Sequence, residues 1–172
     1  IVGCGRVGAM VARFSMAFGM RVVGYDPYRT TDALAAMGIA AVPLKTLLRE
    51  SDIVSLHPLL VEETVGMIGA SELSLMKKEA VLINTARGEL VDEAALLRAL
   101  ETRAIAGAAL DVVQHEDDLY AGRAAHPLIA YAQVHDNLLI TPHIAGMAVE
   151  SVWKTSEYIA EKIVQAADAM AR

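Results

Sequence analysis

Residues suited to nucleotide chemistry stand at the start of the chain, where glycines recur at a fixed spacing. The segment Gly3–Gly8 reads GCGRVG, a GxGxxG pattern whose first glycine permits a tight turn. The second glycine lets the backbone approach a pyrophosphate, and the third lets a helix pack on the preceding strand. Backbone amides and the helix dipole at Arg6 and Val7 favour the same anion. The pattern therefore predicts a nucleotide site at Gly3, Gly5, Arg6, Val7 and Gly8.

A carboxylate follows this turn at the spacing of a dinucleotide site. The segment Arg21–Tyr25 (RVVGY) predicts a short buried strand, and Asp26 comes directly after it, 18 positions beyond Gly8. A carboxylate there accepts hydrogen bonds from the adenosine ribose diol and repels a 2′-phosphate, which favours NAD over NADP. Arg29 is an alternative phosphate partner that keeps NADP open. The alternative for Asp26 itself is a turn residue ahead of Pro27.

The elements that must position these residues alternate between helix and strand. Short, nearly continuous apolar runs are typical of parallel strands covered on both faces. Further strands are predicted at Ile53–Leu56, Ala80–Ile83, Ile105–Leu110 and Leu138–Ile140. Helices are predicted at Leu44–Glu50, Glu72–Lys77 and Glu93–Leu100, the last capped by Asp92. The pattern predicts an α/β fold, a Rossmann-type doubly wound parallel sheet.

The two ends of the chain carry separate expectations. Only Ile1 and Val2 precede the glycine turn, too few for the strand that normally leads into it, so we expect earlier residues in the mature protein and a truncated first strand here. A long helix is predicted over about residues 148–169. Its apolar stripe comprises Val149, Val152, Trp153, Ile159, Ile163, Val164 and Ala167. A length of 172 residues predicts one domain, residues 1–172.

Composition restricts the classes of protein and partner. A formal net charge of −6 argues against nucleic acid or an anionic membrane surface as a partner. A single cysteine excludes an intramolecular disulfide framework and suits a reducing compartment, so a cytoplasmic location is expected. No apolar run approaches the roughly 20 residues that span a bilayer.

The segment Val113–Tyr131 is rich in charge and small residues and predicts a surface loop leading into a short helix. Its run His115–Asp118 contains four side chains that can bind metals. Consecutive residues seldom converge on one ion, so a solvated loop is expected and no metal is predicted.

Six segments occur in a fixed order across essentially the whole chain: GCGRVG, GYDPY, VSLHPLLVEET, LINTARGELVDE, GAALDV and TPHIAG. Together they resemble the cofactor-binding domain of the D-isomer-specific 2-hydroxyacid dehydrogenases, which include phosphoglycerate, glycerate, lactate and formate dehydrogenases. The resemblance implies an oxidoreductase that uses NAD and transfers hydride between nicotinamide and C2 of a 2-hydroxy or 2-oxo acid.

The resemblance also implies three catalytic residues. Arg87 matches the arginine that grips the substrate carboxylate, a task suited to a planar and permanently charged guanidinium. His143 matches the acid/base residue, since imidazole titrates near neutral pH. Glu116 matches the carboxylate that favours the imidazolium form. The family commonly has E-x-E-P in this stretch, whereas this chain has Gln114 at the first acid and no proline, so Asp117 is an alternative to Glu116.

Further cofactor contacts follow from the same resemblance. Asp111 matches the residue that accepts from the nicotinamide carboxamide, its alternative being a strand-end turn residue. Ala148 stands where the family often has threonine or serine, and the proline of VSLHPLLVEET comes one residue earlier than usual. The remaining cofactor candidates are His57, Thr64, Thr85, Ala86, His143 and Gly146.

In the family this domain is inserted in a substrate domain, which is expected to be absent from this chain. The chain alone is therefore expected to bind NAD(H) but to turn over little substrate, and the full-length protein to form a homodimer. Two other functions are open: an NAD(H)-sensing protein similar to a transcriptional corepressor, and a plain nucleotide-binding module. The module predicts that loss of Arg87 or His143 leaves activity unchanged.

Overall fold

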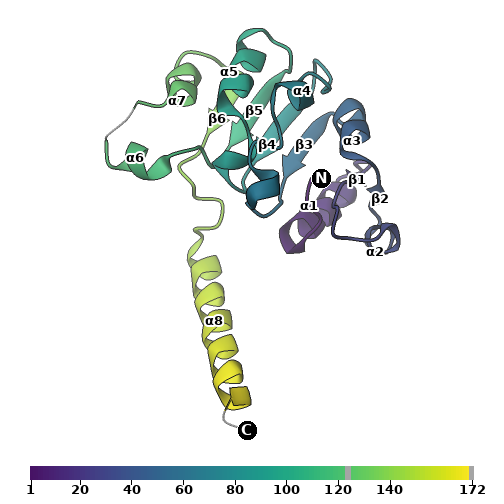
Figure 1. Ribbon diagram of the computed structural model, residues 1–172, viewed down its shortest axis with the longest axis vertical. Coiled ribbons are helices and arrows are strands. Elements are labelled where there is room, and N and C mark those ends of the chain that lie inside the picture. The colour runs from purple at the N-terminus through teal and green to yellow at the C-terminus, as the bar shows by residue number, and fades with distance from the viewer. Residues whose placement is uncertain (123–124, 171–172) are drawn as a thin grey trace. The chain divides into compact units, whose positions relative to one another are not determined.

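The computed structural model describes residues 1–122 and 125–170 (Figure 1). By its contacts the chain divides into two compact units, Ile1–Thr141 and Pro142–Arg172. Among the described residues, every strand lies in the first unit, and the second unit contains one long helix.

The first unit is built on parallel strands in two sheets that meet at Val2. Val2 forms parallel bridges to Tyr25 on one side and to Leu56 on the other, so it stands between the sheets. The spatial order is therefore β2, β1, Val2, β3, β4, β5 and β6, which is doubly wound as predicted. The strands are β1 (Val23–Gly24), β2 (Ala40–Ala41), β3 (Ile53–Leu56), β4 (Val81–Asn84), β5 (Gly107–Leu110) and β6 (Leu138–Ile140).

A row of apolar side chains fixes the register of the four-stranded sheet. Val54 pairs with Leu82, Leu82 with Ala108, and Ala108 with Leu138. All four are buried in the main core. If any of these strands shifted by one residue, its apolar residue in this row would point to the opposite face of the sheet. The apolar pattern therefore specifies the pairing.

Helices cover this sheet, and two predictions about them are confirmed. Helix α3 spans Leu44–Glu50 as predicted. Helix α5 spans Glu93–Glu101, and the carboxylate of its N-cap Asp92 accepts from the backbone N–H of Ala95 at 2.9 Å. Figure 1 shows α5 beside α7 (Pro127–Ala132), which also contacts β6.

Several sequence-based bounds were wrong. Strands β1, β4 and β5 begin one or two residues later than predicted. Helix α4 spans Ala70–Leu73 rather than Glu72–Lys77, because the Glu72 side chain accepts from the backbone N–H of Gly69 and so belongs to the first turn. The region expected to be a loop before a short helix contains α6 (Glu116–Tyr120) as well as α7. Single-turn 3₁₀ helices occur at Glu62–Thr64 and Gly88–Leu90.

Beside β1 and β2 lie α1 (Arg6–Ala17) and α2 (Thr31–Ala35). Their core is a small cluster comprising Cys4, Ala12, Val22, Leu34 and Ile39. Helix α1 contributes few residues to it, since its buried residues are Gly8 and Ala12.

The second unit consists mainly of α8 (Val149–Met170), a helix of 22 residues close to the predicted range. The apolar stripe that the sequence predicts on it is exposed, with Trp153 at 68%. Within the described part of the chain, no helix combines the length and apolar character needed to cross a membrane.

Candidate cofactor and catalytic site

The glycine turn has the geometry of a phosphate-binding turn. Gly3 has φ +82°, and a Cβ there would lie 2.6 Å from the backbone nitrogen of Pro58. A Cβ on Gly8 would collide with the carbonyl oxygen of Gly3, so helix and turn pack without side chains between them. Gly5 is the N-cap of α1 and has no side chain to cap the helix, and a Cβ there would meet nothing within 4 Å. The first amides of α1 are thus left for a ligand anion.

The side chain of Asp26 is hydrogen-bonded to this turn. Its Oδ2 accepts from the backbone N–H of Cys4 at 2.9 Å, and its Oδ1 accepts from that of Tyr28 at 2.9 Å. A carboxylate offers about four acceptor positions, so these bonds leave others for ribose hydroxyls. The two interpretations of Asp26, turn residue and ribose acceptor, are therefore compatible.

A cavity of about 750 Å³ opens next to this turn. Its volume lies in the usual range for small-molecule sites, and Gly5, where a Cβ would meet nothing, faces it. Among the predicted cofactor residues, the cavity wall brings together Gly3, Gly5, Asp26, His57 and Thr64. The two glycines, the carboxylate and the size of the cavity fit a dinucleotide.

His57 and Thr64 also have local structural roles. Thr64 Oγ1 accepts from the backbone N–H of Val61 at 2.9 Å and closes the 3₁₀ turn at Glu62–Thr64. Nε2 of His57 lies 2.9 Å from Oγ of Ser55. Burial lowers the pKa of His57 to about 4, so this wall of the cavity carries a neutral imidazole.

Arg87 follows β4 and its side chain is exposed. Asn84, buried at the end of β4, holds the loop, because its Nδ2 donates to the carbonyl of Arg87 at 2.8 Å. Its Oδ1 accepts from the backbone N–H of Ala86 at 3.1 Å. Thr85 and Ala86 lie in this loop, Thr85 exposed and Ala86 half-buried. Asn84 is not among the predicted site residues, although an amide directly after a predicted buried strand is a usable signal.

Asp111 follows β5 and is buried. Its backbone N–H donates to the carbonyl of Asn84 at 2.9 Å, and its Oδ1 accepts from Oγ1 of Thr141, which follows β6. Asp111 therefore connects the carboxyl ends of β4, β5 and β6, the edge where ligands bind in doubly wound sheets.

Glu116 is the first residue of α6 and is half-buried, whereas the alternative Asp117 is exposed. Oε1 of Glu116 accepts from the backbone N–H of Val113 at 2.9 Å. Gln114, which stands where the family commonly has an acidic residue, has a structural role. Its Nε2 donates to the carbonyl of Val91 at 2.7 Å, and a carboxylate could not donate this bond.

His143 and Gly146 belong to the second unit. His143 is exposed and has φ +53°, a left-handed conformation in which histidine is more frequent than most residues. Gly146 is exposed, and a Cβ there would meet nothing within 4 Å.

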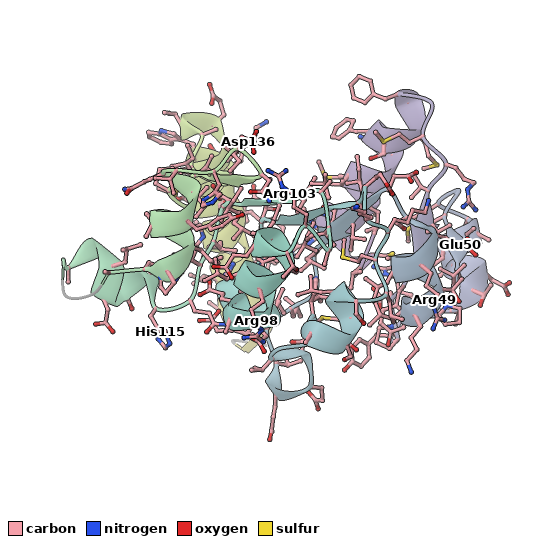
Figure 2. All side chains as sticks on the ribbon, turned by 90° about the horizontal axis from the view of Figure 1, so that it is seen from above. Arg49, Glu50, Arg98, Arg103, His115 and Asp136 are labelled. Carbon is pink, nitrogen blue, oxygen red and sulfur yellow. The ribbon has the colours of Figure 1, made fainter. Side chains whose placement is uncertain are left out.

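Figure 2 shows His115 at the margin of the first unit, where its backbone also adopts a left-handed conformation with φ +56°. In the described ranges, no three His, Cys, Asp or Glu side chains are grouped so that they could hold a metal ion.

Comparison with known proteins also indicates an NAD-binding domain. Residues 1–145 match the NAD-binding domain of the D-isomer-specific 2-hydroxyacid dehydrogenases. The chain is 44% identical over 168 residues to the glyoxylate reductase of Korarchaeum cryptofilum, with 95% of this chain and 47% of that protein covered. It is 37% identical over 167 residues to the D-3-phosphoglycerate dehydrogenase of Archaeoglobus fulgidus, with 97% of this chain and 30% of that protein covered.

Solved structures agree on the fold. The D-lactate dehydrogenase of Aquifex aeolicus, complexed with NAD and lactic acid, has a TM-score of 0.83 at 40% identity, over 99% of this chain and 52% of that one. An NAD-complexed D-isomer-specific 2-hydroxyacid dehydrogenase of Lactobacillus delbrueckii ssp. bulgaricus has a TM-score of 0.87 at 34% identity, over 98% and 52%. The chain spans about half the length of its glyoxylate reductase relatives.

Proposed function

Since the chain belongs to the D-isomer-specific 2-hydroxyacid dehydrogenases through their NAD-binding domain, we propose that the complete protein interconverts a 2-oxo acid and a 2-hydroxy acid. The observation that carries this proposal is the placement of Arg87, Asp111 and Glu116 after neighbouring strands at the carboxyl edge of one sheet. The glyoxylate reductases among the relatives suggest a short 2-oxo acid as the substrate.

NAD(H), when bound, supplies or accepts the hydride. Gly3, Gly5, Gly8 and the first amides of α1, at Arg6 and Val7, would hold its pyrophosphate, and Asp26 its adenosine ribose. His57 and Thr64 would line the same pocket. The remaining cofactor contacts are proposed at Thr85, Ala86, Asp111, His143 and Gly146.

Three side chains would serve the reaction. The Arg87 guanidinium would bind the substrate carboxylate through a bidentate pair of hydrogen bonds and polarise the oxo group. In the reductive direction the His143 imidazolium would protonate the developing alkoxide oxygen, and in the oxidative direction neutral imidazole would take that proton back. Glu116 would favour the imidazolium form.

We also propose that the complete protein is a cytoplasmic homodimer. The apolar side chains on α1 and its C-cap support the dimer, because Val7, Met10, Phe14 and the C-cap Phe18 recur at helical spacing and are each more than half exposed. A second copy of the chain would cover them. The single cysteine supports a reducing compartment.

The test is NADH oxidation by the full-length protein with glyoxylate, hydroxypyruvate and pyruvate, followed by absorbance. Arg87→Ala and His143→Ala are expected to lower kcat/KM about 100-fold or more while NADH still binds. The control is Arg103→Ala. This exposed arginine forms an ion pair with Asp136 at 3.5 Å, and the two residues precede the amino ends of β5 and β6, not the carboxyl ends where the proposed site lies (Figure 2).

Two outcomes would contradict the proposal. Tight NADH binding without turnover of any oxo acid would favour an NAD(H) sensor. Full activity in both variants would favour a plain binding module.

A further inference from the structure

The loops that carry Arg87 and Glu116 are in direct contact. Gly88 lies against the backbone that leads to Glu116: a Cβ on Gly88 would overlap the carbonyl of Val113 and lie 2.5 Å from the backbone nitrogen of Gln114. The loop after β4 and the loop after β5 therefore form one packed assembly.

Glu93, the first residue of α5, connects this assembly to α7. Its Oε1 accepts from the backbone N–H of Gln114 at 2.8 Å. Its Oε2 lies 3.0 Å from Nε2 of His126, the N-cap residue of α7. The Glu93 and His126 side chains are only 15% and 10% exposed, so water screens this pair little.

The two ring nitrogens of His126 show which of its atoms donates the hydrogen bond to Glu93. Nδ1 of His126 is buried and has no hydrogen-bond partner in the part of the chain that the structure describes. The ring is therefore held through Nε2 alone, and Nε2 must carry a proton to donate to the carboxylate. Since Glu93 is an acceptor at both oxygens, it satisfies two buried donors from two segments at once.

We propose that Glu93 is a positioning residue for Glu116. It fixes the Gln114 backbone two residues before Glu116 and fixes the start of α7 beyond it, so the short helix α6 is held from both sides. This inference rests on the proposed function, because it assigns to Glu93 the placement of a catalytic carboxylate that Glu93 itself does not touch.

The experiment compares Glu93→Ala with Glu93→Gln in the full-length protein. Glutamine keeps one oxygen for the Gln114 amide, whereas alanine removes both acceptors. We expect Glu93→Ala to lower kcat for oxo acid reduction about 10- to 100-fold, with the dissociation constant for NADH unchanged, and Glu93→Gln to restore most of the activity. The matched control is Glu101→Ala, an exposed carboxylate at the other end of α5.

A double-mutant cycle separates positioning from a general loss of stability. If Glu93 acts through Glu116, the alanine variant adds little further loss of kcat in a Glu116→Gln background. Fully additive losses, or a Glu93→Gln variant as impaired as Glu93→Ala, would overturn the proposal.

Hydrogen exchange tests the contact independently of the reaction. The Gln114 amide should exchange about tenfold faster or more in Glu93→Ala than in Glu93→Gln, because only alanine leaves it without an acceptor. Equal exchange in both would contradict the positioning role. A wild-type protein that reduces no oxo acid while this difference is present would refute the proposed function and leave the contact established.

Discussion

The backbone N–H of Cys4 donates to Oδ2 of Asp26 over 2.9 Å, which ties the glycine turn to the end of the neighbouring strand. Cys4 and Asp26 lie 22 residues apart in the sequence, and their bond stands beside a second one, from the backbone N–H of Gly3 to the carbonyl of Tyr25 at 2.8 Å. The carboxylate that would select the ribose also fixes the turn that would hold the phosphates.

Replacing Asp26 should therefore affect both affinity and cofactor choice. Asp26→Ala is expected to weaken NADH binding about 10- to 100-fold, since it removes a charged acceptor from the turn and from the ribose. Asp26→Asn keeps an acceptor oxygen but loses the charge, so it should narrow the preference for NADH over NADPH. Fluorescence titration with both cofactors measures this, with Asp32→Asn in α2 as the control. An unchanged preference in Asp26→Asn would show that the charge does not select NAD.

Gly88→Ala should destabilise the fold. The added Cβ would overlap the Val113 carbonyl, which belongs to backbone and cannot rotate away. We expect the free energy of unfolding to fall by about 2 kcal/mol or more in urea denaturation. Gly69→Ala is the matched control, because a Cβ there makes only ordinary contacts, the nearest 3.5 Å from Oε2 of Glu72. Equal losses in the two variants would contradict the close packing at Gly88.

His57 should make stability depend on pH below neutrality. Its pKa is lowered from 6.5 to about 4 in the folded chain, so between these values the unfolded chain binds more protons. Stability should therefore fall as the pH decreases from 6.5 toward 4, while above 6.5 this group has no effect. Urea unfolding at pH 7 and pH 5 should show a smaller decrease for His57→Asn than for the wild type. A histidine NMR titration with a midpoint near 6.5 for His57 would contradict the prediction.

A charge on the apolar face of α1 should disrupt the proposed homodimer. Phe14 is 52% exposed although it is aromatic. Phe14→Asp would place a carboxylate in the apolar interface without a partner, which is unfavourable. Sedimentation of the full-length protein should show a shift from dimer to monomer, whereas Val134→Asp, at an exposed position beyond α7, should leave the dimer intact. A wild-type monomer would refute the dimer proposal directly.

The sequence predicted the sheet well because its strands are short apolar runs buried on both faces. Ile53–Leu56 and Leu138–Ile140 match the observed strands residue for residue. The strand Ala40–Ala41 was missed, since two alanines carry almost no pattern and their pairing with Val23 and Gly24 is set by the neighbouring strand. Short elements of this kind depend on tertiary contacts more than on local propensity.

The candidate site was predicted from motifs where the signal is local. The glycine turn and Asp26 have a spacing that can be read directly, and the structure brings them to one cavity. Glu93 and Gln114 could not be recognised, because their importance comes from a hydrogen bond between residues 21 positions apart. An acidic residue in the first turn of a helix has a sufficient local explanation in the helix dipole, which hides such a role.

The chain has a single cysteine, and Cys4 is completely buried inside the glycine turn, where burial raises the pKa of its thiol. A thiol that is both inaccessible and protonated reacts slowly with alkylating reagents. The rate of alkylation of this chain would therefore measure how often the turn opens. A bound cofactor that closes the turn would slow the labelling, so cofactor binding could be followed without an absorbance signal.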